Sequence, residues 1–412
     1  MKTPSRRGRL AGAAITLTFV LAGCSGQSTS GKKTGAAPKA SASPNTADTG
    51  AATLRTTLTQ GLHDHVWLAG VAINTAVQRG LDAPATKSAI AALDGNTVSL
   101  GQAIGSVYGA DAEKAFLPLW RKHIDFFVDY TVAGLKKDAA KQAKAKSDLD
   151  GYRNDFGAFL SSANPNLTKD AVANELVPHV QMILSTIDAA IAKDPSVFAK
   201  MADAAEGISH TAGVLAAGIA KQMPEKFGGD ADAGGATLRS NLTGLLNDHV
   251  WLAGIAIDTA VTSGLDSTMT KAATQALDAN TQDLGKAIGS VYGDDAEKAF
   301  LPLWRKHIEF FVNYTVAGAK GDAAGQTKAK SDLDGYRSDF GAFLAGANPN
   351  LTKQAVANEL VPHVDSLLVA IDAVLAKSSD VAKKVTEAAA IAPKTGTALA
   401  TAIAKQYPAK FV

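Results

Sequence analysis

Six histidines, arranged as two sets of three, are the residues of this 412-residue chain with the clearest capacity for chemistry. The second set follows the first at a constant offset of 184 positions (307 − 123 = 184). Imidazole nitrogens are common ligands of zinc, copper and iron, so three that met at one point would form a metal or small-ligand site. The sets are His65, His123 and His179 in the first half, and His249, His307 and His363 in the second.

Helical spacing predicts that the three histidines of a set do meet. Each lies on the apolar face of a predicted helix, 11 or 12 residues after the start of that helix. At a rise of about 1.5 Å per residue, all three are about 17–18 Å from the same end of the bundle. Alternate helices of an up-and-down bundle run in the same direction, so this distance places the histidines on one level. The predicted helix starts in the first half are Thr53, Asp111 and Thr168.

Polar residues near the histidines could complete the site. Glu175 precedes His179 by four residues and therefore shares its helix face, as Glu359 does with His363. Asp148 and Tyr152 of the helix after His123 also fall near its level. Three imidazoles and a carboxylate suit copper, zinc or iron. Affinity for these metals should fall below about pH 6, because imidazole must be neutral to coordinate.

The histidine pattern is also compatible with a protein that binds no metal. Each histidine could be a core residue that forms a hydrogen bond with Asp or Glu on a neighbouring helix. The common level could also follow from misplaced helix starts, since a predicted start carries an error of about 2–4 residues. Spacing alone does not distinguish a metal site from a hydrogen-bonded core layer or from histidines on different levels.

The helices that carry the histidines belong to a repeated, all-α domain. Alanine is abundant, and no useful stretch shows the alternation of apolar and polar residues that is typical of strands. Residues 104–124 return at 288–308 with one change, Ala110 to Asp294. We therefore predict two tandem up-and-down bundles of about six helices each, at residues 52–228 and 236–412, joined by a flexible linker at 229–235. Each bundle is long enough to bury its own core, so the first should fold alone as a monomer.

The N-terminal region has the features of a bacterial lipoprotein signal. Residues 1–23 contain a basic start and a short apolar run, and Leu21-Ala22-Gly23-Cys24 resembles the lipobox that precedes a lipidated cysteine. Cys24 is the only cysteine of the chain, so no internal disulfide can form. Residues 24–51 are mostly small and polar and should form a flexible tether. We expect a lipid on Cys24 that anchors the protein to the extracytoplasmic face of the cell membrane.

Composition and motifs argue against nucleic-acid binding and against catalysis. Removal of the signal leaves 37 basic residues (41 − 4 = 37) against 39 acidic ones, with no basic patch. The sequence contains no phosphate loop, dinucleotide fingerprint, His-Glu-x-x-His helix or cysteine pair. It therefore favours a non-enzymatic, membrane-tethered lipoprotein that binds a transition metal or small ligand in each bundle. The alternative is a structural lipoprotein whose bundles contact another protein of the cell envelope.

Three stretches resemble a family of secreted α-helical proteins and lipoproteins of Gram-positive bacteria. They are residues 64–69, 103–123 and 156–167, and the resemblance extends over both repeats. It implies an all-α fold and a location outside the cytoplasm. Some members carry the label copper amine oxidase, but the resemblance does not imply that activity here. The cofactor-forming Asn-Tyr-Asp/Glu motif of those oxidases is absent, and the nearest string is Asn313-Tyr314-Thr315.

Overall fold

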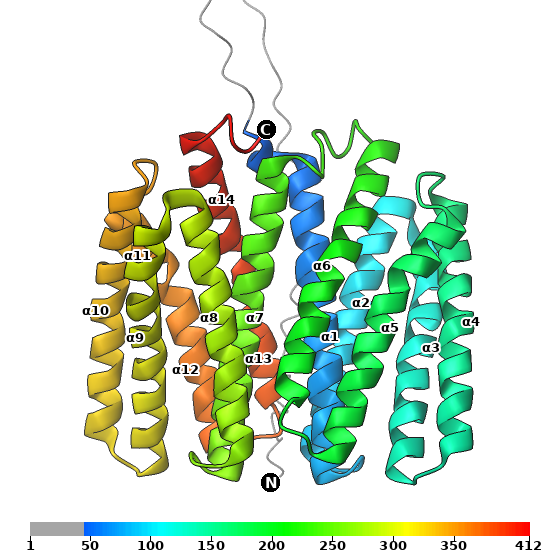
Figure 1. Cartoon of the computed structure of the whole chain (residues 1–412), viewed down its shortest axis with the longest axis horizontal. Coiled ribbons are helices and arrows are strands. Elements are labelled where there is room, and N and C mark those ends of the chain that lie inside the picture. The colour runs from blue at the N-terminus through cyan, green and yellow to red at the C-terminus, as the bar shows by residue number, and fades with distance from the viewer. Residues whose placement is uncertain (1–44) are drawn as a thin grey trace, which may run out of the picture. The chain divides into compact units, whose positions relative to one another are not determined.

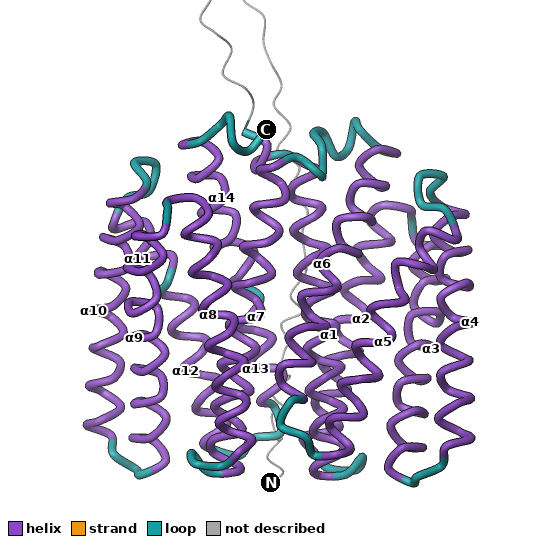
Figure 2. The backbone as a smooth tube through the Cα atoms, viewed as in Figure 1, coloured by secondary structure: helices purple, strands orange, loops and turns teal. Residues whose placement is uncertain are grey.

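Helices form all of the regular secondary structure in the part of the chain that the computed structural model describes, residues 45–412 (Figure 2). The all-α prediction is therefore confirmed. None of the helices in this range is long and apolar enough to cross a membrane. The predicted signal, Cys24 and most of the predicted tether lie outside the described residues.

The helices follow the two predicted repeats (Figure 1). A short 3₁₀ helix, η1 (Thr46–Asp48), precedes the first repeat. Within residues 45–412, the first repeat has six α-helices: α1 (Gly50–Arg79), α2 (Pro84–Tyr108), α3 (Ala110–Leu135), α4 (Ala139–Ala163), α5 (Lys169–Ala192) and α6 (Val197–Gln222). The second repeat has eight in the same range: α7 (Gly234–Ser263), α8 (Thr268–Tyr292), α9 (Asp294–Ala319), α10 (Ala323–Ala347), α11 (Lys353–Glu359), α12 (Val361–Leu375), α13 (Val381–Ala389) and α14 (Ala392–Gln406).

The additional helices of the second repeat arise from breaks and not from insertions. Pro393 occupies the position that Ser209 has in the first repeat, and it lies where α13 gives way to α14. Proline lacks the N–H that a continuous helix needs, so α6 is unbroken and its counterpart is not. α11 and α12 meet at Leu360, which keeps helical angles, so these two helices continue each other almost directly.

A glycine turn sets the direction of the third helix in each repeat. Gly109 (φ +92°) lies between α2 and α3, and Gly293 (φ +91°) lies between α8 and α9. Residues with a Cβ atom are strained at such angles, whereas glycine is not. The turn lets α3 reverse direction directly after Tyr108, and α3 then packs against α1 with His123 buried between them.

The first helices of the two repeats, α1 and α7, pack against each other and join the repeats through a shared hydrophobic cluster (Figure 1). Trp67 of α1 and Trp251 of α7 are buried and stack, with ring centroids 6.5 Å apart and ring planes 10° apart. Thr59 and Ser240 share a 2.7 Å hydrogen bond at the same interface. The largest hydrophobic cluster contains residues of both repeats, and a smaller one lies within the second repeat, so the bundles share part of their core.

The segments that precede α1 and α7 also belong to the folded protein. Arg239 donates a hydrogen bond to the carbonyl of Ala47 at 3.1 Å, and its counterpart Arg55 donates one to the carbonyl of Ala231 at 2.8 Å. Both alanines are buried. Residues 45–51, which we placed in the tether, are therefore folded, and the 229–235 segment is bound to α1. Sequence patterns missed both segments because such small residues carry no periodic signal and gain their order from the opposite repeat.

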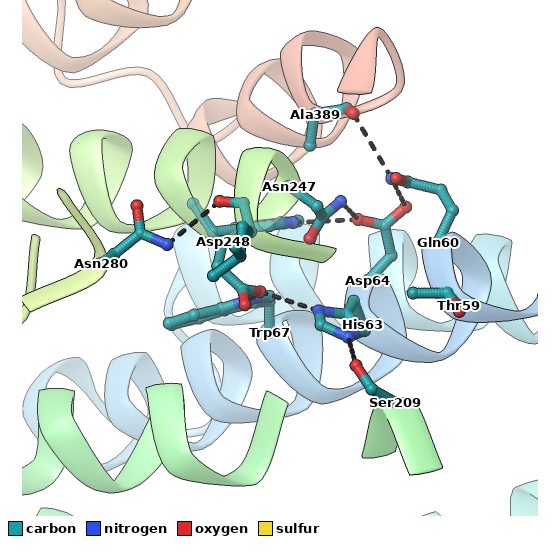
Figure 3. Close-up of polar contacts among 12 residues, drawn as sticks. Thr59, Gln60, His63, Asp64, Trp67, Ser209, Asn247, Asp248, Asn280 and Ala389 are labelled. Carbon is teal, nitrogen blue, oxygen red and sulfur yellow. Dashed lines mark hydrogen bonds and ion pairs between the residues drawn. The ribbon is translucent and has the colours of Figure 1, made fainter. Parts of the chain in front are cut away.

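Two buried carboxylates at this interface each accept hydrogen bonds from the opposite repeat (Figure 3). Asp248 accepts one from the indole of Trp67 at 2.7 Å. Asp64 accepts one from the indole of Trp251 at 2.9 Å and one from the amide of Asn247 at 2.8 Å. Burial raises the pKa of Asp64, and these hydrogen bonds oppose the rise because they favour the ionised form. The contacts are reciprocal, as in the isologous interface of a symmetric dimer.

This reciprocity predicts that the first repeat, produced alone as residues 45–228, is a homodimer and not the monomer that its length suggested. The fragment would expose Trp67 and Asp64, and a second copy of the same face offers the same partners. Size-exclusion chromatography with light scattering should give twice the fragment mass, and Trp67→Ala should abolish the dimer. A stable fragment of single mass, with the melting temperature of the full chain, would contradict this interpretation of the interface.

Candidate metal centre

The structure brings the three histidines of each repeat together, at the level that their spacing predicted. His65 comes from α1, His123 from α3 and His179 from α5, and one ring nitrogen of each lies within 4.8 Å of the others. We call this group the first triad. The second triad has the same arrangement and consists of His249 from α7, His307 from α9 and His363 from α12.

The nitrogen atoms of each triad lie near the separations that a single ion would impose. Nε2 of His65 is 3.2 Å from Nε2 of His123, and the same atoms of His249 and His307 are also 3.2 Å apart. Two imidazoles bound at about 2.0–2.1 Å to a tetrahedral or trigonal ion have nitrogens about 3.3–3.6 Å apart. Two ligands of each triad therefore already have the spacing of a bound pair, and the third needs to move by at most about 1.5 Å.

Aromatic side chains enclose the first triad. The ring centroid of Trp120 lies 4.9 Å from that of His65 and 4.7 Å from that of His123, and Tyr152 of α4 stacks on His123 at 4.9 Å. Phe127 meets the rings of His123 and His179 edge-on. His65 and His123 are each only 3% exposed, so packing fixes the orientation of their rings. The second triad has equivalent walls, made by Trp304, Tyr336 and Phe311.

Burial keeps the triads uncharged. It lowers the pKa of His123 to about 3 and that of His179 to about 4. The pKa of His65 is lowered well below its usual value, first by burial and then by repulsion from the other two rings. These lowered pKa values bear on the expectation that metal affinity falls below about pH 6, because with them protons compete with a metal for the folded triad only at a lower pH. Local spacing could not reveal this, since the shift depends on how completely other helices cover the rings.

Neither of the predicted carboxylates belongs to a triad. Glu175 accepts hydrogen bonds from Nδ1 of His210 at 2.7 Å and from the hydroxyl of Thr211 at 3.0 Å. Glu359 pairs with Lys394, the counterpart of His210, at 3.0 Å. Each glutamate thus has a basic partner near the C-terminal end of its repeat. Among the neutral imidazoles of a triad, the same carboxylate would be a buried charge with no partner. The structure therefore does not bring Glu175 or Glu359 into the groups that converge, although the sequence placed them with the metal ligands.

Of the two polar residues of α4 that were predicted near the level of His123, one lies at the site. Tyr152 stacks on His123, and its hydroxyl is buried without a hydrogen-bond partner among the described residues. Burial raises the pKa of that hydroxyl well above 10, so the tyrosine stays neutral. Asp148 instead forms an exposed ion pair with Lys144 at 2.6 Å.

The alternative of a hydrogen-bonded core layer does not describe the triads well. In residues 45–412, the first triad contains one direct hydrogen bond between side chains, in which one imidazole of His65 and His123 donates to the other. The Nδ1 atoms of His65 and His179 are buried and have no partner there. Each such atom costs roughly 1–3 kcal/mol. The triad thus lacks the Asp or Glu partners that such a layer would use, but the unpaired Nδ1 atoms do not separate the two interpretations, because metal ligation through Nε2 would leave them without a partner as well.

A further polar cluster, formed by His63, Asp248 and Ser209, lies where the repeats meet. The spacing of residues in the sequence did not predict it. His63 lies between Asp248 and Ser209, with Nδ1 2.9 Å from the carboxylate and Nε2 2.7 Å from the hydroxyl (Figure 3). This is the connectivity of a serine–histidine–aspartate triad. Ser209, however, lies inside α6, where backbone N–H groups bond within the helix and are not free to stabilise an oxyanion. Because His63 is only 1% exposed, we interpret the cluster as a contact that joins the repeats.

Comparison with protein-family models, with curated proteins and with solved structures finds no match to this chain. What can be assigned therefore comes from the fold and the site. The chain is a tandem-repeat helical-bundle protein, and each repeat contains three converging histidines that could hold a metal ion.

Proposed function

We propose that this protein binds one transition-metal ion in each repeat, at the first and second triads. The observation that carries the proposal is the convergence of three neutral imidazole nitrogens within 4.8 Å of one another, twice in the same chain. Imidazole suits copper, zinc and iron, and three protein ligands leave one coordination position free. The aromatic walls support the proposal because they orient the rings before a metal arrives, which reduces the entropic cost of binding.

The charge of the site favours copper(I) among these ions. Neither triad includes a carboxylate, and the walls of Trp120 and Tyr152 are uncharged. A divalent ion would bury two positive charges without a counter-charge, whereas copper(I) would bury one. Zinc(II) or iron(II) would have to bring an anion from solution as its fourth ligand.

Elemental analysis of the full mature protein tests this proposal. After loading under reducing, anaerobic conditions and removal of free metal, we expect close to two copper ions per chain, one for each triad. Zinc and iron should be retained less well in the same procedure. The proposal fails if the protein remains metal-free after exposure to all three metals and its melting temperature does not respond to them.

We also propose a location, from the sequence alone. The N-terminal pattern and the resemblance to secreted α-helical proteins of Gram-positive bacteria support a lipoprotein that is anchored through Cys24 to the outer face of the cell membrane. A diacylglyceryl group would supply two acyl chains, and two chains give stable anchoring where a single chain does not. In this setting the protein would act as a metal-binding lipoprotein without catalytic activity of its own.

Replacing Cys24 with alanine is expected to move the protein from the membrane fraction to the medium, or to leave it as an uncleaved precursor. Alanine has no thiol to accept the lipid, whereas Ser25→Ala changes the next residue and keeps the thiol. Fractionation and gel migration of the two variants provide the measurement. If Cys24→Ala behaves like the parent and like Ser25→Ala, the anchoring proposal is wrong.

A further inference from the structure

An apolar pocket of about 140 Å³ opens from the surface of the first repeat onto the first triad. His65 and His179 form part of its lining, Asp125 and Thr131 of α3 add two polar side chains, and the rest is apolar and comes mostly from α1, α2, α3 and α5. Its volume is close to that of the apolar protein cavities that stay dry and bind benzene or xenon, about 150 Å³. The lining includes Ala69, Ala76, Leu93, Phe127 and Ile183.

Exposed apolar side chains surround the opening of this pocket. Leu81, Ile90 and Val128 all line it, and each is between 38% and 44% exposed. Large hydrophobic residues with such exposure are few among residues 45–412, so three at one opening form a patch and not a scatter. Asp125 lines the pocket too, and Asp129 is close enough to repel it, so the negative charge here disfavours anions.

We propose that this pocket binds a small, uncharged apolar molecule, of the size of dioxygen or carbon monoxide, and holds it against His65 and His179. An apolar wall strips water from anything that enters, which costs little for such a molecule and much for an ion. The pocket reaches two of the three imidazoles, so its occupant lies next to the coordination position that three protein ligands leave free. That last step rests on the proposed function, whereas the pocket itself does not require a metal.

Xenon tests the pocket without any metal. In the metal-free full chain, xenon should shift the methyl resonances of Ile90 and Ile183 in a saturable manner. Ala76→Leu places a branched side chain in the pocket and should abolish these shifts. The matched control Ala260→Leu makes the same change at the equivalent position of the second repeat and should leave them intact. Absence of saturable shifts in the parent, or their persistence in a folded Ala76→Leu protein, would overturn the proposal.

Carbon monoxide tests whether the pocket leads to the metal. With copper(I) in both triads, carbon monoxide should give a copper–carbonyl infrared band, and Ala76→Leu should remove the contribution of the first triad. Azide, an anion of similar size, should not bind there. Carbonyl binding that is unchanged by Ala76→Leu would contradict the inference that the pocket leads to the metal of the first triad. Xenon binding in a protein that takes up no metal would uphold the pocket and overturn the proposed function, so the two failures can be told apart.

Discussion

Replacing His123 with alanine is expected to lower the copper content of the full chain from about two ions to about one. The substitution removes one imidazole of the first triad and leaves the second triad complete. Loss of groups that merely orient a metal ligand costs 10–100-fold in affinity, so loss of a ligand itself should cost at least about 100-fold. Elemental analysis after dialysis, and titration against a copper(I) chelator, measure the two quantities.

Matched variants separate metal binding from structural damage. His307→Ala should remove the other ion, and the double variant should retain none. His210→Ala changes a histidine that is outside both triads and exposed, so both ions should remain. If His123→Ala lowers the melting temperature but leaves the copper content at the parent value, the triad is a structural cluster and not a metal site.

The fold and the triads could be predicted from sequence because both depend on spacing along single helices. The 3.6-residue periodicity gave the inward faces, and equal distances from the predicted starts placed His65, His123 and His179 on one level. The repeat then gave the second triad without further argument. Glu175 shows the limit of such reasoning, because a shared helix face does not say which neighbouring helix a long side chain reaches.

The interface between the repeats was missed for a different reason. Residues 63–68, in the middle of α1, are all buried, so every side of this helix is covered. We assigned α1 a single inward face with His65 on it, as for a helix at the surface of a bundle. Six consecutive residues span all faces of a helix, and a run that includes Trp67 and Leu68 on different sides indicates a helix surrounded by others. That run was the available signal that α1 packs against a second repeat.

The metal-free protein is expected to lose stability steeply as the pH falls from about 6.5 to about 4. In the folded state burial lowers the pKa values of the triad histidines, to about 3 for His123 and His307 and about 4 for His179 and His363. In the unfolded chain these groups take up protons near pH 6.5. Below that pH the unfolded state binds more protons, so the free energy of unfolding decreases. At pH 5 the loss is roughly 2 kcal/mol for each of these four histidines, and His65 and His249 act in the same direction, so the combined loss is a large part of the stability of a typical domain.

Melting temperatures of the parent at pH 7, 6, 5 and 4 test this expectation, and a triple variant isolates the contribution of one triad. With His65→Leu, His123→Phe and His179→Leu, the decrease between pH 6 and pH 5 should be about half that of the parent. Copper(I) should move the transition to lower pH, because it binds only the folded triads. Copper release should then coincide with unfolding and not precede it, since the folded imidazoles stay neutral down to about pH 4. Release near pH 6 from a protein that is still folded would show that the triads are far more hydrated than their burial implies.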